Sequence, residues 1–161
     1  MAKRKGNRPA LASLLDQYGN TCKSLKLKPT YANLIAVKQF AGTSAGRFYL
    51  KGWLTRRQLD AADAFATALH NYDRAMGMPS RTAKCLNMLA VKGKPSDGDP
   101  TRRDRVAIHM YEAMVAKIGC KDILIACATE DRITMLRNKM ALAAALDRVA
   151  DHLGIERKEA A

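Results

Sequence analysis

Two tetrapeptides in this chain place a pair of arginines at the predicted start of a helix. Residues 55–58 read Thr-Arg-Arg-Gln and residues 101–104 read Thr-Arg-Arg-Asp. A threonine with Gln or Asp three residues later is typical of a capped helix N-terminus. The first turn of a helix carries partial positive charge, so a cation there is disfavoured by about 0.3–1 kcal/mol. Two such arginine pairs predict sites prepared for an outside anion, and phosphate suits both the guanidinium groups and the helix N-terminus.

Further basic residues extend this prediction to three groups. The N-terminal segment holds cations that would each neutralise a phosphate while carrying little sequence information. Another group lies at the start of the last predicted helix. The alternative interpretations are an exposed surface for the arginines and a solubilising tail or expression remnant for the N-terminal segment. The candidate nucleic-acid-binding residues are Lys3, Arg4, Lys5, Arg8, Arg56, Arg57, Arg102, Arg103, Arg105, Arg132, Arg137 and Lys139.

Residues of the types needed for catalysis or metal binding do not cluster along the chain. His70, His109 and His152 have no metal-ligand spacing with a cysteine or an acid, and none has a nucleophile beside it. The sequence contains no phosphate-binding glycine motif. Its four cysteines show no CxxC spacing, which is typical of reduced, buried thiols. We therefore expect a protein that is not an enzyme, with no catalytic residue, metal site or cofactor.

The formal net charge of +13 is distributed unevenly. Residues 1–51 hold ten Lys and Arg against one acid, whereas the rest of the chain is nearly balanced. Such asymmetry indicates a nucleic-acid or anionic-surface partner. The basic opening is not followed by the apolar core of a signal peptide, and no apolar run approaches the length of a membrane span. We therefore expect a cytoplasmic protein with no membrane partner.

The elements that must position these residues are predicted to be helices. The chain is 48% hydrophobic and only 6% aromatic, and its abundant Ala, Leu and Met favour helices over strands. The clearest helix begins at Thr55, where Leu54 and Leu59 have the spacing of a hydrophobic staple, and it ends before Gly77. Other helices are predicted over residues 9–18, 30–40, 44–51, 81–91, 101–118 and 129–153, with a loop over 92–100. Residues 33–40 would also suit a strand.

Three of these segments carry further expectations. From Val106 onward the helix over 101–118 is apolar nearly all round, which is typical of a central helix covered by its neighbours. Residues 122–128 suit either a buried strand or a short helix. The acidic turn at 129–131 loosely resembles that of a helix-turn-helix, although the following helix is rich in alanine and leucine after Asn138, as a core helix is.

The sequence therefore predicts an all-α, single-domain helical bundle of about five to seven helices. Residues 1–29 are expected to form a basic, partly disordered N-terminal arm, and residues 30–155 the helical domain. Residues 156–161 are expected to form a frayed tail.

Two segments give the chain a family resemblance. The first is 47–79, which begins Arg-Phe-Tyr-Leu-Lys-Gly-Trp-Leu-Thr-Arg-Arg, and the second is 143–155, Ala-Ala-Ala-Leu-Asp-Arg-Val-Ala-Asp-His-Leu-Gly-Ile. Together they resemble small, largely uncharacterised proteins of alphaproteobacteria and their phages, some described as transcriptional regulators. The likeness covers about two thirds of the chain, leaves out residues 1–40 and rests mostly on helix-packing residues. It implies a phage or prophage context and carries over no catalytic or ligand residue.

These observations lead us to expect a phage-type DNA-binding protein that regulates transcription in a bacterial host cell, with DNA favoured over RNA. The helix starts would grip phosphates while the arm follows the backbone or a groove. The alternative is a structural or DNA-packaging protein that acts as an oligomer, and an inhibitor of a host nucleic-acid machine also stays open. A second copy of the chain or a host protein is a further partner that the sequence leaves open. If the two Thr-Arg-Arg helix starts lie far apart in space, they cannot hold phosphates together as one clamp. The N-terminal arm is then the only binding element left.

Overall fold

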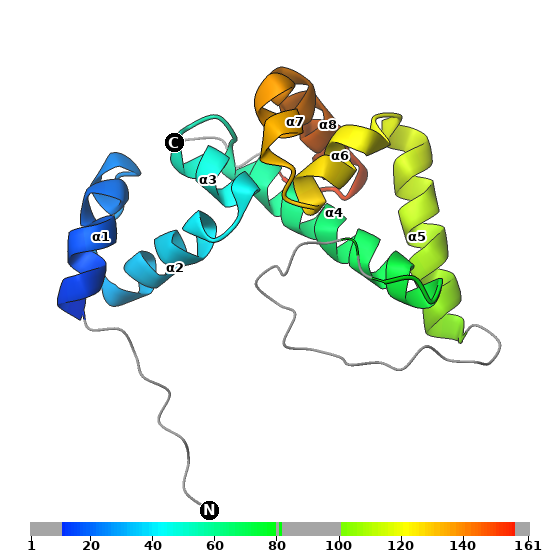
Figure 1. Ribbon diagram of the computed structural model, residues 1–161, viewed down its shortest axis with the longest axis horizontal. Helices are drawn as coiled ribbons and strands as arrows, with labels where there is room; N and C mark the ends of the chain where they lie inside the picture. The colour runs from blue at the N-terminus through cyan, green and yellow to red at the C-terminus, as the bar shows by residue number, and fades with distance from the viewer. Residues whose placement is uncertain (1–10, 80, 82–100, 157–161) are drawn as a thin grey trace, which may run out of the picture.

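The computed structural model describes residues 11–79, 81 and 101–156, and these residues fold into helices (Figure 1). The expected all-α, single-domain bundle is confirmed. The described residues form eight helices instead of five to seven, because residues 121–128 form a helix of their own and the last predicted helix is divided in two. The helices are α1 (Leu11–Ser24), α2 (Tyr31–Ala41), α3 (Ser44–Leu50), α4 (Arg56–Ala75), α5 (Arg102–Ile118), α6 (Lys121–Ala128), α7 (Arg132–Arg137) and α8 (Lys139–His152).

Some predictions concern residues that the structure does not describe. These are the helix over 81–91 after its first residue, the loop over 92–100, the end of the C-terminal tail, and the cations Lys3, Arg4, Lys5 and Arg8. Among the helices that are described, none combines the length and the apolar composition needed to cross a membrane.

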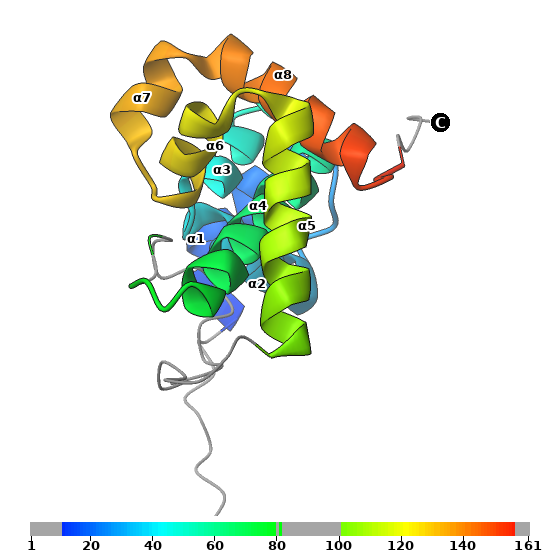
Figure 2. The same cartoon turned by 90° about the vertical axis from the view of Figure 1, so that its right-hand side faces the viewer.

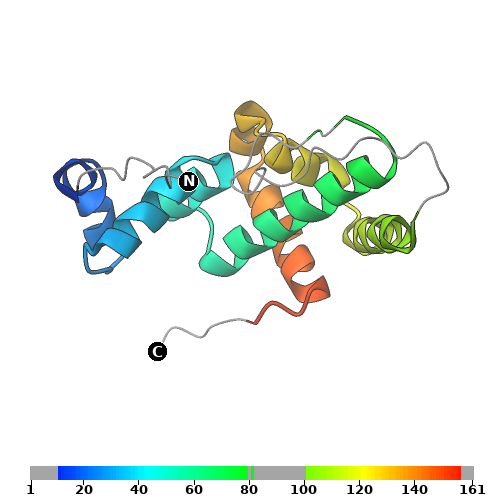
Figure 3. The same ribbon diagram turned by 90° about the horizontal axis from the view of Figure 1, so that it is seen from below.

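α4 is the central helix of the bundle, and its apolar face forms the middle of the core. Thr55 caps it as predicted, and the staple residues Leu54 and Leu59 are both buried. α5, α6 and α8 all pack against α4, which crosses the middle of the molecule in Figures 1 and 3. Its largest buried apolar side chains recur at helical spacing and form one apolar face: Leu59, Phe65 and Leu69.

α5 lies at the edge of the bundle rather than at its centre (Figures 1 and 2). It packs against α4 and α8, and its buried side chains are Tyr111, Met114 and Ile118. On its outer face Val106 and Met110 are 50% and 54% exposed. The expectation of a central helix covered all round is therefore wrong, because none of the described helices covers that outer face.

The C-terminal part of the chain forms three helices. Residues 122–128, for which the sequence left a strand or a helix open, are helical and lie in α6. After a short turn α7 begins, with Asp131 as its N-cap. The expected continuous helix through residue 153 is wrong, because Asn138 leaves the helical conformation at φ −121° and ψ 31°. Three large apolar side chains on either side of the break are exposed: Ile133, Leu136 and Met140.

α1 and α2 form a hairpin that projects from the rest of the bundle (Figures 1 and 3). α1 continues through Gly19, where the sequence predicted a helix end, so the segment after residue 18 is helical up to Ser24. Part of the segment expected to form the arm is therefore a helix that packs on α2. The hairpin has a small core of its own: Leu14, Cys22, Leu34 and Val37.

Candidate nucleic-acid interface

The two Thr-Arg-Arg starts are capped as predicted, and both form complete capping boxes. Thr55 exchanges hydrogen bonds with Gln58, and Thr101 with Asp104, at distances of 2.8–3.2 Å. The starts nevertheless lie far apart, because α5 begins beside the C-terminal end of α4 (Figure 1). α4 has 20 residues and therefore spans about 30 Å. The predicted joint clamp is wrong.

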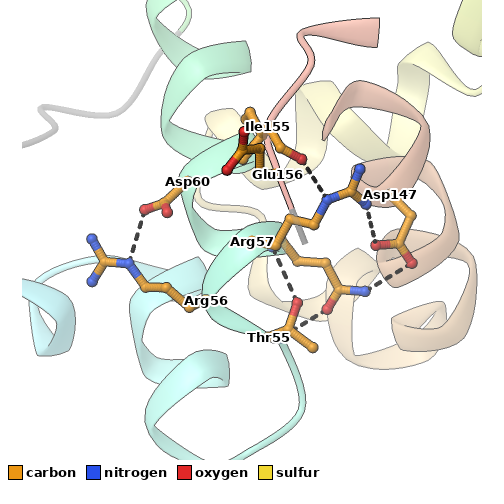
Figure 4. A pocket seen from close by; sticks show the side chains of 8 residues that line it. Thr55, Arg56, Arg57, Asp60, Asp147, Ile155 and Glu156 are labelled. Atoms are coloured by element: carbon orange, nitrogen blue, oxygen red, sulfur yellow. Dashed lines mark hydrogen bonds and ion pairs between the residues drawn. The ribbon is translucent and has the colours of Figure 1, made fainter. Parts of the chain in front are cut away.

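Arg57 is directed toward α8 and the C-terminal segment, where its own chain supplies its partners (Figure 4). Its guanidinium donates to the backbone carbonyl of Ile155 at 2.8 Å and forms ion pairs with Asp147, at 3.5 Å, and with Asp151. The side chain is only 12% exposed. Arg57 therefore does not face outward as the prediction of phosphate binding requires, and the acidic side chains of α8 pair with it.

Arg56 is exposed, but partners from the same chain also hold it. It forms an ion pair with Asp60 at 3.0 Å, and its guanidinium lies 5.1 Å from the ring centroid of Phe40. Beside it a cavity of about 810 Å³ opens at the start of α4 (Figure 4). Three carboxylates line this cavity against two arginines, so a polyanion gains little there: Asp60, Asp147 and Glu156.

Arg102, Arg103 and Arg105 are exposed at the start of α5. Asp104 lies among them, and hydrogen bonds from Thr101, with smaller effects of nearby arginines, hold the pKa of its carboxyl below the ordinary value of 3.8. The carboxylate therefore stays ionised at neutral pH and offsets part of the local positive charge. Of the candidates that the structure describes, none from another helix joins this group.

The third predicted group lies on one exposed surface. Arg132 and Arg137 belong to α7 and Lys139 begins α8, and all three side chains are exposed. None of them forms an ion pair within the part of the chain that the structure describes. By contrast, four arginines elsewhere are each paired with a carboxylate: Arg47, Arg56, Arg57 and Arg81.

Apolar side chains share this surface with the cations. Ile133 is 66% exposed, Leu136 is 47% exposed and Met140 is 78% exposed. Large apolar side chains exposed this far, and grouped together, mark an interaction surface more often than scattered ones do. We call this surface the α7 face: Arg132, Ile133, Leu136, Arg137, Lys139 and Met140.

Glu130 fixes the turn before α7 against α3. Its carboxylate accepts the backbone N–H of Ser44 at 2.7 and 2.9 Å, the Ser44 hydroxyl, and the guanidinium of Arg47 at 3.2 Å. Glu130 has φ +63°, a left-handed conformation that costs about 1–2 kcal/mol for a residue with a side chain. The hydrogen bonds to α3 offset that cost, so the α7 face has a defined position relative to α3.

Local side chains hold both ends of α7. Asp131 accepts the backbone N–H of Thr134 at 3.2 Å and its hydroxyl at 2.6 Å. These bonds from Thr134, the hydroxyl first, hold the pKa of Asp131 below 3.8. At the other end the side-chain amide of Asn138 donates to the carbonyl of Thr134 at 3.2 Å. A helix of only six residues is thereby fixed while most of its side chains face outward.

The sequence prediction missed two residues beside the α7 face, Lys51 and Trp53. The Nζ atoms of Lys51 and Lys139 lie 5.2 and 5.1 Å from the centroid of the Trp53 ring, which is 39% exposed. Trp53 is the only tryptophan of the chain, but no local pattern connects it with Lys139, far along the sequence. This contact depends on the tertiary structure and could not be predicted from spacing.

Comparisons with known proteins found no matching family model, curated protein or solved structure. Within the described residues there is also no group of three or more His, Cys, Asp or Glu side chains that could hold a metal ion.

Proposed function

We propose that the protein binds nucleic acid through the α7 face, as a DNA-binding regulator of transcription of the phage type. The observation that carries this proposal is the contrast in charge pairing. Among the described residues, Arg132, Arg137 and Lys139 are exposed without an ion pair, whereas Arg47, Arg56 and Arg57 each pair with a carboxylate. Unpaired cations on one surface are available to phosphates.

The arrangement of α6 and α7 supports DNA as the partner. Two helices joined by a short turn present the second helix outward, which is how a helix-turn-helix offers its recognition helix to the major groove. Arg132 and Arg137 would contact phosphates or guanine edges, and Ile133 and Leu136 would contact thymine methyl groups. Lys3, Arg4, Lys5 and Arg8 would add contacts that do not depend on sequence.

The biological setting is part of the same proposal. The resemblance of residues 47–79 and 143–155 to phage and prophage proteins supports a role in the cytoplasm of a bacterial host. The net charge of +13 supports association with a polyanion.

Fluorescence anisotropy with a labelled DNA duplex at about 50 mM salt tests the proposal, because phosphate contacts are strong under that condition. We expect wild-type binding to weaken steeply with salt. The double variant Arg132→Ala, Arg137→Ala should make the slope of log K against log salt less steep by about 1.8, or about 0.9 per lost phosphate contact.

The matched control exchanges Arg102→Ala and Arg103→Ala, which removes the same charge from the start of α5. It should leave the slope nearly unchanged. Wild-type protein that binds neither DNA nor RNA at this salt would overturn the proposal, and so would a control that loses as much affinity as the α7 variant.

A second candidate function is assembly into a structural or DNA-packaging oligomer. The outer face of α5 favours it, because Val106 and Met110 lie one turn apart and are both about half exposed. Light scattering after size exclusion would report a defined multiple of the 17.7 kDa chain. A monomer at all concentrations would remove this candidate.

A further inference from the structure

Trp53 holds two lysines from distant parts of the chain at one exposed point. Lys51 follows the end of α3 and Lys139 is the first residue of α8. Their ammonium groups lie 5.2 and 5.1 Å from the same ring centroid. The buried ring of Phe48, 5.2 Å from Trp53 between centroids, anchors the indole to the core. The ring that both lysines contact is therefore anchored to the core.

The chemistry of this arrangement leaves the two charges available. An exposed cation–π contact contributes only about 0.5–1 kcal/mol and does not neutralise the ammonium group. Neither lysine forms an ion pair within the described residues, in contrast to Arg57 with its two carboxylates. Two ammonium groups that face the same ring repel each other, and an anion that contacts both would relieve that repulsion.

We propose that Lys51 and Lys139, held by Trp53, form a clamp for a backbone phosphate of the bound nucleic acid. This inference rests on the proposed function, since Lys139 belongs to the α7 face and the phosphate belongs to the nucleic acid bound there. Stacking of a base on Trp53 is the competing use of an exposed aromatic ring. The positions of both ammonium groups over that ring favour the phosphate, because a stacked base would have to displace them.

The single tryptophan makes this site directly observable, because all intrinsic tryptophan emission comes from Trp53. The experiment titrates the full chain with unlabelled duplex DNA at about 50 mM salt and follows that emission. We expect the emission to change with the same midpoint as the anisotropy signal. Inorganic phosphate, added alone, tests whether the clamp needs the polymer.

Lys51→Gln is the decisive variant. It should remove most of the emission change and lower the salt slope by up to about 0.9, the effect of one phosphate contact, because Lys139 still faces the same phosphate. The matched control is Lys117→Gln, an exposed lysine of α5, which should change neither quantity. Circular dichroism checks that both variants are folded as the wild type is.

Three outcomes separate the possibilities. If the Arg132 and Arg137 variant loses affinity but Lys51→Gln keeps the wild-type slope and emission change, the clamp is wrong and the proposed function stands. If single strands change the emission more than duplex does, and Lys51→Gln does not reduce that change, base stacking replaces the clamp. If the wild type binds no nucleic acid in the anisotropy assay, the proposed function itself fails.

Discussion

Arg56 and Arg57 are neighbours in the sequence, yet their side chains lie in different surroundings. Arg56 stays exposed on α4, whereas Arg57 reaches the carboxylates of α8 and the carbonyl of Ile155. Tertiary packing therefore explains why Arg57 lies in the first turn of α4, where the helix dipole disfavours a cation. An arginine at this position fastens α8 and the C-terminal segment to the central helix.

Replacing Arg57→Ala should lower the free energy of unfolding by about 1.5–3 kcal/mol, because charged hydrogen-bond partners lose their donor. Urea denaturation measures the change. Arg56→Ala is the control and should cost less than about 1 kcal/mol, since its ion pair is exposed. Equal losses for the two variants would show that Arg57 does not fasten α8.

Asp131 gives a prediction in the acid range. Its pKa is lowered in the folded protein by hydrogen bonds from Thr134, so the folded state favours the carboxylate. The stabilisation is complete above the ordinary value of 3.8 and is lost as the pH falls through the lower pKa of the folded state. Carboxyl NMR titration should place the midpoint below 3.8, and Thr134→Val should raise it. A wild-type midpoint at or above 3.8 would contradict the capping of α7.

Among the elements, the helix starts could be predicted best, because their signals are local. Thr55 and Thr101 cap the helices that the sequence assigned to them, and each partner lies three residues on. The division between α7 and α8 could not be predicted, since the apolar pattern continues across Asn138. The edge position of α5 was also missed. The apolar pattern shows which side chains could be buried, but it does not show which other helices pack against α5.

The turn between α6 and α7 offers an element-scale prediction. Glu130→Ala should lower the free energy of unfolding by about 1.5–3 kcal/mol, because the carboxylate accepts charged hydrogen bonds from Ser44 and Arg47. It should also weaken DNA binding, since the α7 face loses its attachment to α3. Thermal denaturation and anisotropy measure the two effects. Glu112→Ala, an exposed acid of α5, is the control and should change stability by less than about 0.5 kcal/mol.

A variant Glu130→Ala that is as stable as the wild type would show that α3 does not hold this turn. A variant that loses stability but binds DNA normally when folded would place the DNA contact elsewhere.

On the scale of the whole molecule, the sequence prediction named candidate cations but could not say which of them lie together. The two Thr-Arg-Arg starts lie at opposite ends of the α4–α5 pair, although their sequences match (Figure 1). Conversely, Trp53 and Lys139 are far apart in the chain and in contact in the fold. Spacing along the chain predicts local caps, whereas the grouping of charges depends on how α3, α4 and α8 pack.

The central claim is that nucleic acid lies on the α7 face, and backbone amide NMR of this 17.7 kDa chain tests it most directly. On addition of duplex DNA, the largest shift changes within residues 11–156 should fall at 132–141 and 51–53, with little change at 102–106. Changes confined to the start of α5 or of α4, with residues 132–141 unaffected, would contradict it.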